Sequence, residues 1–105
     1  MLVLSDGATQ KYLHRLIEHA ARIKLAAIYQ DRAFVDASAL MSHGLNICRH
    51  FEHAAHHVDK ILRGAKPADV PVELPTTFDL VINLNSGKAL DIPPTLIALA
   101  DEVIE

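Results

Sequence analysis

Histidine is the residue type whose number and spacing most suggest chemistry in this sequence. Seven of the 105 residues are histidine, and four of them fall close together, at His50, His53, His56 and His57. In a helix, His50, His53 and His57 share a face, and neutral imidazoles so placed can bind a transition metal. These three span about 10 Å, too far for one ion to reach comfortably, so the candidate pair is His53 and His57, with Glu52 nearby in sequence. A solvated helix face without metal is the more common outcome, since metal sites normally use three or four ligands, and we expect no resident metal.

The other reactive side chains do not form a catalytic set. Cys48 is a lone thiol with no evident third group to orient a base, so packing is expected rather than nucleophilic catalysis. Asp31 and Asp36 stand where helix caps or solvated faces place acids. The four glycines lie too far apart to form a phosphate-binding loop. We therefore predict a protein that is not an enzyme and needs no cofactor.

Composition excludes several classes of protein. The net charge is −3, with only 10 lysines and arginines, and aromatic residues make up 5%, which argues against a nucleic-acid surface. Half of the residues are hydrophobic, so the chain is not of a disordered type. No apolar run approaches the ~20 residues that cross a bilayer. The first residues lack the features of a signal peptide, which predicts a cytoplasmic location if synthesis starts at Met1.

Strand-like and helical stretches alternate along the first part of the chain. Short apolar runs at 2–4, 25–29 and 39–42 are typical of buried strands. Apolar residues at helical spacing follow each run, over 13–23, 31–37 and 47–62. This order predicts an α/β fold, a three-layer unit with a small, mainly parallel sheet.

The C-terminal part changes character. Pro67, Pro71 and Pro75 recur every four residues in a stretch that should be extended. Residues 78–84 alternate as in a strand, 86–90 suggest a helical turn, and Pro94 opens a predicted last helix that reaches Ile104. We therefore divide the chain into an α/β lobe core (1–64), a Pro-rich extended connector (65–77), and a strand and helix segment of the same domain (78–105).

The carboxyl ends of the predicted parallel strands are the candidate ligand site. They fall at 5–7, 29–31 and 42–44, and each precedes a predicted helix. Ligands of open α/β sheets bind at such ends, and free N–H groups at a helix N-terminus favour an anion such as a carboxylate. The alternative is that these are simply loops with capping residues.

Several segments are similar to stretches that one protein family shares. The most specific segment runs from His57 to Glu73 (HVDKILRGAKPADVPVE), and FDLVINLN from Phe78 supports it. LAAIY from Leu25 and LMSHGLN from Leu40 follow the same order. Together these segments resemble the ABC transporter substrate-binding proteins of the uncharacterised, aromatic-amino-acid-receptor-like type. Relatives often carry a pair of glycines where Ser38 and Ala39 stand, and tyrosine is usual at the position of His43.

This resemblance implies part of a type I periplasmic binding protein, equivalent to a C-terminal lobe fragment. Such proteins hold a small solute between two α/β lobes and deliver it to a membrane permease without catalysis. They are periplasmic, and part of the family suggests amino acids as the solute. By position, the implied ligand-binding residues are Ser5, Asp6, Gly7, Thr9, Tyr29, Asp31, Ser42 and His43.

The sequence leaves two further alternatives open. The strand at 78–84 would pair with this lobe, pair with a second copy or stay loose, and an unpaired strand promotes association, so we predict a homo-oligomer. The chain is then either a solute-binding component of an import system or a cytoplasmic, self-associating α/β interaction module. A metal-binding histidine helix is the weaker alternative.

Overall fold

A computed structural model describes all residues from Met1 to Glu105 and divides into two units. The first unit combines Met1–Gly44 with Asp79–Glu105, and the second is Leu45–Phe78. These units are defined by contacts between residues, and the division into 1–64, 65–77 and 78–105 stays a prediction. Every buried hydrophobic residue belongs to the first unit.

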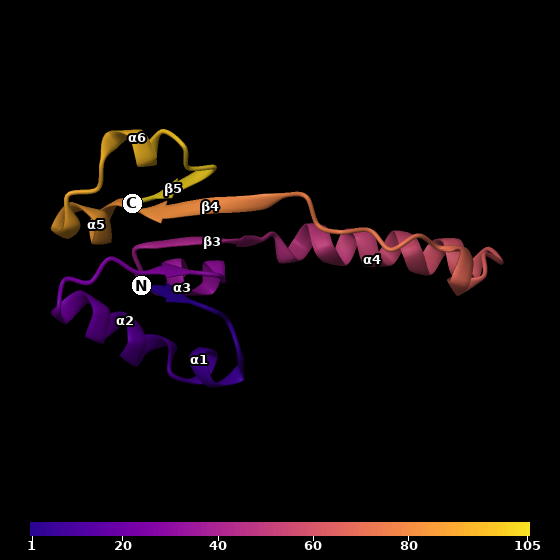
Figure 1. Ribbon diagram of the computed structural model, residues 1–105, viewed down its shortest axis with the longest axis horizontal. Helices are drawn as coiled ribbons and strands as arrows, with labels where there is room; N and C mark the ends of the chain where they lie inside the picture. Colours follow the sequence, from indigo (N-terminus) through magenta and orange to yellow (C-terminus); the bar gives the residue numbers. More distant parts are fainter. The chain divides into compact units, whose positions relative to one another are not determined.

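Five strands form one sheet in the order β1-β2-β3-β4-β5 (Figure 1). Their bounds are β1 Leu2–Val3, β2 Ile28–Tyr29, β3 Met41–Leu45, β4 Phe78–Asn83 and β5 Glu102–Ile104. The pairs β1–β2, β2–β3 and β4–β5 are parallel. The predicted α/β fold with a mainly parallel sheet is therefore confirmed.

Strand β4 pairs within the chain, between β3 and β5. In Figure 1 it runs in the direction opposite to β3, and the Asn83 amide donates to the Leu40 carbonyl at 2.9 Å. The pairing left open by the sequence is thereby settled. An unpaired strand at 78–84 no longer supports self-association, which stays a prediction that needs another basis.

Three helices connect the parallel strands: α1 Gly7–Lys11, α2 Leu13–Arg22 and α3 Arg32–Asp36. Helix α2 buries Ile17 and Ala20, as the apolar spacing predicts. The core cluster that these helices cover also contains Tyr29 and Phe34, whose rings stack with centroids 4.6 Å apart. Large aromatic surfaces packed in this way contribute strongly to a small core.

The C-terminal segment differs from the predicted helix. It contains α5 Leu84–Gly87, the 3₁₀ turn η2 Lys88–Leu90 and the single turn α6 Pro94–Ile97, and it ends in β5. Backbone bonds from β4 explain the change, because the Asp101 amide donates to the Leu80 carbonyl and the Leu80 amide donates to the Asp101 carboxylate. The β-branched residues Val103 and Ile104 suit the strand that follows.

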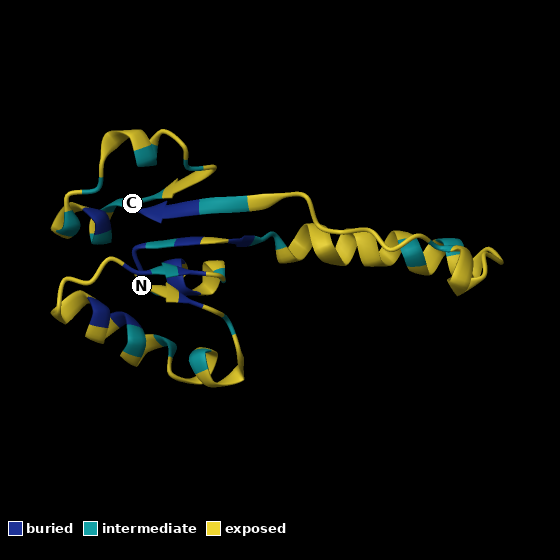
Figure 2. Cartoon of the chain, viewed as in Figure 1, coloured by how far each residue is buried: buried dark blue, intermediate teal, exposed yellow.

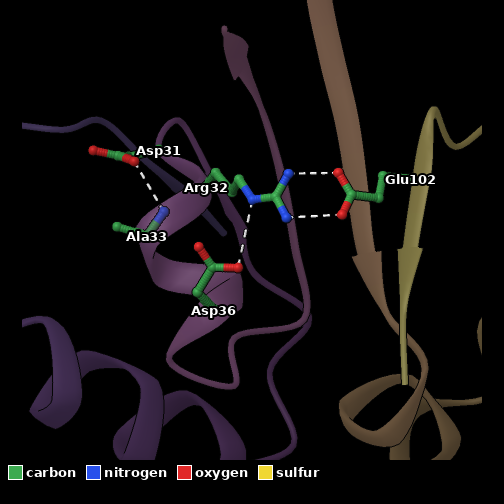
Figure 3. Close-up of polar contacts among 5 residues, drawn as sticks. All are labelled: Asp31, Arg32, Ala33, Asp36 and Glu102. Atoms are coloured by element: carbon green, nitrogen blue, oxygen red, sulfur yellow. Dashed lines mark hydrogen bonds and ion pairs between the residues drawn. The ribbon is translucent and has the colours of Figure 1, made fainter. Parts of the chain in front are cut away.

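An ion pair joins α3 to the last strand (Figure 3). The Arg32 guanidinium donates to both carboxylate oxygens of Glu102, at 2.5 and 2.7 Å, and its Nε lies 3.5 Å from Asp36. The bond to Glu102 raises the pKa of Arg32. Both side chains are half exposed, so water weakens the pair, but its two parallel bonds fix the geometry.

The second unit contains one long helix and an extended return. Helix α4 spans Ile47–Leu62, begins at an Asn46 cap and ends before Gly64, whose φ of 103° is the left-handed conformation expected there. The 3₁₀ turn η1, Pro67–Asp69, precedes the extended proline-containing segment. No residue of α4 is buried, as Figure 2 shows. None of the helices in the structure combines the length and the apolar character that a membrane span needs.

Candidate functional site

Strand register decides which residues at the sheet edge face the core. Val3, Tyr29 and Ser42 are side by side across β1, β2 and β3, and all three are buried. Side chains alternate between the two faces of a strand. The next residues, Leu4, Gln30 and His43, are accordingly exposed.

Four polar side chains meet where β1 and β2 end. The Ser5 amide donates to Gln30 Oε1 at 3.1 Å. Gln10 Nε2 donates to Ser5 Oγ at 3.1 Å and to Asp31 Oδ2 at 2.7 Å. We call Ser5, Gln10, Gln30 and Asp31 the strand-end cluster. It unites two of the predicted site residues with two glutamines that the sequence reasoning did not single out, although Gln30 lies between Tyr29 and Asp31.

Asp6 and Thr9 form a reciprocal cap at the start of α1. Asp6 Oδ1 accepts from the Thr9 amide at 2.7 Å, and Thr9 Oγ1 accepts from the Asp6 amide at 2.8 Å. Hydrogen bonds from the backbone and the side chain of Thr9 lower the pKa of the exposed Asp6 carboxyl. Gly7 follows at the first helical position, where an added methyl group would meet open space. The Asp6 carboxylate thus already occupies part of the N–H surface that a solute carboxylate would use.

Tyr29 and Ser42 lie on the core side of the sheet. Tyr29 is 1% exposed, and burial raises the pKa of its hydroxyl. Its side chain lines a small, mostly apolar cavity together with Ile17, Ala20 and Leu40. The structure therefore groups Ser5 and Asp31 at one place and directs Tyr29 and Ser42 into the core.

Gly44 brings the ends of β2 and β3 together. A Cβ atom placed on Gly44 would collide with the Gln30 carbonyl group. Only a residue without a side chain permits this approach, which positions the His43–Gly44 part of β3 next to Gln30 of the strand-end cluster. His43 is exposed there.

The histidines of α4 face the extended return within the second unit. His53 Nδ1 and His57 Nε2 lie 3.5 and 3.7 Å from the same Glu73 oxygen. The carboxylate near this pair is Glu73, not the Glu52 considered from the sequence. His57 Nδ1 is buried without a hydrogen-bond partner. The structure contains no group of three or more His, Cys, Asp or Glu residues placed to hold a metal ion.

Comparison with protein families gives one match over almost the whole chain. The model of a family described as ABC transporter substrate binding protein matches residues 1–104. Comparison with curated proteins gives no match.

Solved structures share this fold. A conserved domain protein from Vibrio cholerae is 25% identical, with a TM-score of 0.85 over 97% of this chain. An ABC domain from Streptococcus pneumoniae, solved in complex with L-Trp, is 23% identical, with a TM-score of 0.83 over 98% of this chain. A substrate-binding protein with adhesive properties from Clostridium difficile, ligand-free and open, is 22% identical, with a TM-score of 0.71 over 99% of this chain.

The chain corresponds to one part of these larger proteins. It covers 35% of the Vibrio and Clostridium chains and 36% of the Streptococcus chain. The matched part is thus about a third of each relative.

Proposed function

Because this chain belongs to the ABC transporter substrate-binding protein family, whose members are not enzymes, we propose that it takes part in solute binding for an ABC import system. The solute is a small, amino-acid-like molecule that carries a carboxylate. Its binding surface is the carboxyl edge of β1, β2 and β3, the part of an open α/β sheet where ligands bind. Delivery of the solute to a membrane permease outside the cytoplasm is part of the same proposal.

The strand-end cluster is the observation that carries this proposal. The Gln10 side chain donates hydrogen bonds to Asp31 Oδ2 and Ser5 Oγ, and the Ala33 amide donates to Asp31 Oδ1 at 2.9 Å. These bonds fix the Asp31 carboxylate in place. A fixed carboxylate is a good acceptor for the ammonium group of an amino acid.

The solute carboxylate requires donors from the same edge. The Ser5 hydroxyl and the exposed His43 ring are the donors nearest in the strand order, and the start of α1 at Gly7 adds partial positive charge. Thr9 acts through the cap, because its amide already donates to Asp6 Oδ1. Asp6 acts in this scheme through the cap that it forms, and Tyr29 and Ser42 act by supporting the strand ends from the core. The relative solved with L-Trp supports amino acids as the solute class.

Thermal unfolding in the presence of single amino acids tests the proposal. A solute present at 100 times its Kd stabilises the folded state by about 2.7 kcal/mol, a rise of about 10 °C in Tm for a chain of this size. The variant Asp31→Asn keeps an oxygen for the Ala33 amide but loses the charge, so we expect its Kd to rise at least ~10-fold.

Asp36→Asn is the matched control, since Asp36 is an exposed carboxylate at the other end of the short helix that Asp31 caps, and it is paired with Arg32. It should bind as the unmodified chain does. If no amino acid raises the Tm, or if the two variants bind alike, the proposed site is wrong.

A further inference from the structure

One nitrogen atom of the strand-end cluster, Gln10 Nε2, links the end of β1 to the start of α3. It lies 2.7 Å from Asp31 Oδ2 and 3.1 Å from Ser5 Oγ. An ionised carboxylate accepts hydrogen bonds and donates none, so the Gln10 amide has to present its nitrogen to Asp31. That nitrogen has two hydrogens, and the bonds to Asp31 and Ser5 use both of them.

The Ser5 hydroxyl has a defined direction as a result. Because Ser5 Oγ accepts from Gln10, the hydroxyl hydrogen points away from Gln10 and remains a donor. The backbone of Ser5 is held as well, since its amide donates to Gln30 Oε1 at 3.1 Å. Two glutamine side chains therefore fix both the position of Ser5 and the direction in which its hydroxyl donates.

Asp31 is kept as an acceptor by the same amide. Its Oδ1 accepts from the Ala33 amide at 2.9 Å (Figure 3), and its Oδ2 accepts from Gln10, so each oxygen retains a lone pair for a further donor. Two acceptors on the two hydrogens of one amide nitrogen lie about 5 Å apart, which is too far for the Ser5 hydroxyl to donate to Asp31. Gln10 thus prevents the donor and the acceptor from pairing with each other.

Gln10 is itself fixed by the cap at the start of α1. The Gln10 amide donates to the Asp6 carbonyl at 3.0 Å, inside the turn that the reciprocal bonds of Asp6 and Thr9 close. Thr9 Oγ1 lies 3.1 Å from the Leu4 carbonyl and donates toward it. The helix that carries Gln10 is therefore anchored to the strand end that carries Ser5.

We propose that Gln10 is the positioning residue of the solute site and makes it selective for α-amino acids. Through Gln10, the Ser5 side of the site donates to a carboxylate, and the Asp31 side accepts from an ammonium group. An α-amino acid carries both groups on one carbon atom and can bridge the two sides. A solute with only one of these groups leaves the other side unpaired, which costs affinity. This inference rests on the proposed function and adds the residue that sets its selectivity.

Gln10→Glu tests the positioning role because it keeps the shape of the side chain and removes the hydrogens. The new carboxylate accepts the Ser5 hydrogen and places a second negative charge beside Asp31. The probes are L-phenylalanine, 2-phenylethylamine and 3-phenylpropionate, and a second series of L-leucine, 3-methylbutylamine and 4-methylpentanoate. Within each series only the charged groups change. Isothermal titration calorimetry gives the Kd of each probe.

The expected result is a change in selectivity. In the unmodified chain, the amino acid of at least one series should bind at least ~10-fold more tightly than its amine and its acid. In Gln10→Glu, the Kd of that amino acid should rise at least ~10-fold, whereas the Kd of the amine should stay the same or fall. Gln10→Met removes both bonds without adding charge, so it should weaken the amino acid and leave the amine unchanged.

Asn85→Asp is the matched control. It makes the same change from amide to carboxylate in α5, which follows β4 beside the start of β3 rather than the ends of β1 and β2. All Kd values should stay within about 2-fold of those of the unmodified chain. The near-UV circular dichroism of Tyr29, stacked on Phe34, reports whether each variant is folded.

The outcomes separate the role of Gln10 from the proposed function. A purely structural Gln10 would weaken the amino acid and the amine equally in Gln10→Glu, and that result would overturn the inference. The same change of selectivity in Asn85→Asp would also overturn it, because net charge alone would then be the cause. If no probe binds the unmodified chain, the proposed function is wrong, and the selectivity assigned to Gln10 is wrong with it.

Discussion

Ser38 holds a backbone conformation that glycine adopts more easily. Its φ is 77°, in the left-handed region, where a side chain costs about 1 kcal/mol. The conformation is fixed from outside, since the Ser38 carbonyl accepts from Ser86 Oγ at 2.8 Å. This position precedes β3.

Ser38→Gly should therefore stabilise the protein. We expect the free energy of unfolding to rise by about 0.5 kcal/mol, the strain relieved less the extra entropy of an unfolded glycine. Urea denaturation measures the change. Ser38→Ala removes the same hydroxyl and keeps the strain, so a gain of equal size in that variant would contradict the explanation.

Sequence reasoning located single residues well where the signal was local. Asp6 and Asp31 were recognisable as caps because short polar side chains before a helix satisfy its free amides, and both do so here. No local pattern predicts that the side chains of Tyr29 and Ser42 point into the core. Their burial depends on the register between strands, which a two-residue strand does not encode by itself. Gln10 belongs to the cluster because it donates to Asp31, a residue at the start of another helix. No local sequence pattern predicts such a contact.

Glycine at position 44 determines how closely two elements approach. A methyl group there would collide with the Gln30 carbonyl, which is backbone and cannot turn aside. Gly44→Ala should thus push the ends of β2 and β3 apart and lower the free energy of unfolding by about 1–3 kcal/mol.

Gly7→Ala is the matched control for this element-scale prediction. Gly7 has no atom within 4 Å of an added Cβ and begins α1, where alanine favours the helix. Its stability should stay the same or rise slightly in the same urea titration. Equal losses in the two variants would show that the close approach of position 44 to the Gln30 carbonyl does not limit the sheet.

Long elements were predictable from the sequence and short ones were not. Helices α2 and α4 follow from many apolar residues at helical spacing, and the structure places them within a residue or two of the expected bounds. The last segment has too few residues for a period to be distinctive. The spacing of Ile97, Ala100 and Ile104 suits a helix, but pairing with β4 makes the end a strand. Hydrogen bonds between β4 and β5, which are distant in sequence, therefore determine that the chain ends in a strand rather than a helix.

At the scale of the whole molecule, the buried core and the long helix belong to different units. The core residues all lie in 1–44 and 79–105, whereas α4 and its extended return bury none of their hydrophobic side chains. Folding of the first unit should consequently not need the second, because apolar burial is the main favourable contribution to stability.

The geometry of β3 and β4 offers a direct test of that independence. The bond from the Asn83 amide to the Leu40 carbonyl sets Asn83 opposite Leu40, and the same antiparallel register sets Asp79 opposite Gly44. Residues 45–78 can then be replaced by Asn-Gly, a two-residue turn suited to a hairpin. We expect the shortened chain to unfold cooperatively and to keep the near-UV signal of Tyr29. Calorimetry and near-UV circular dichroism measure these properties. A shortened chain without a cooperative transition would mean that the second unit contributes to the core, against the separation of the two units.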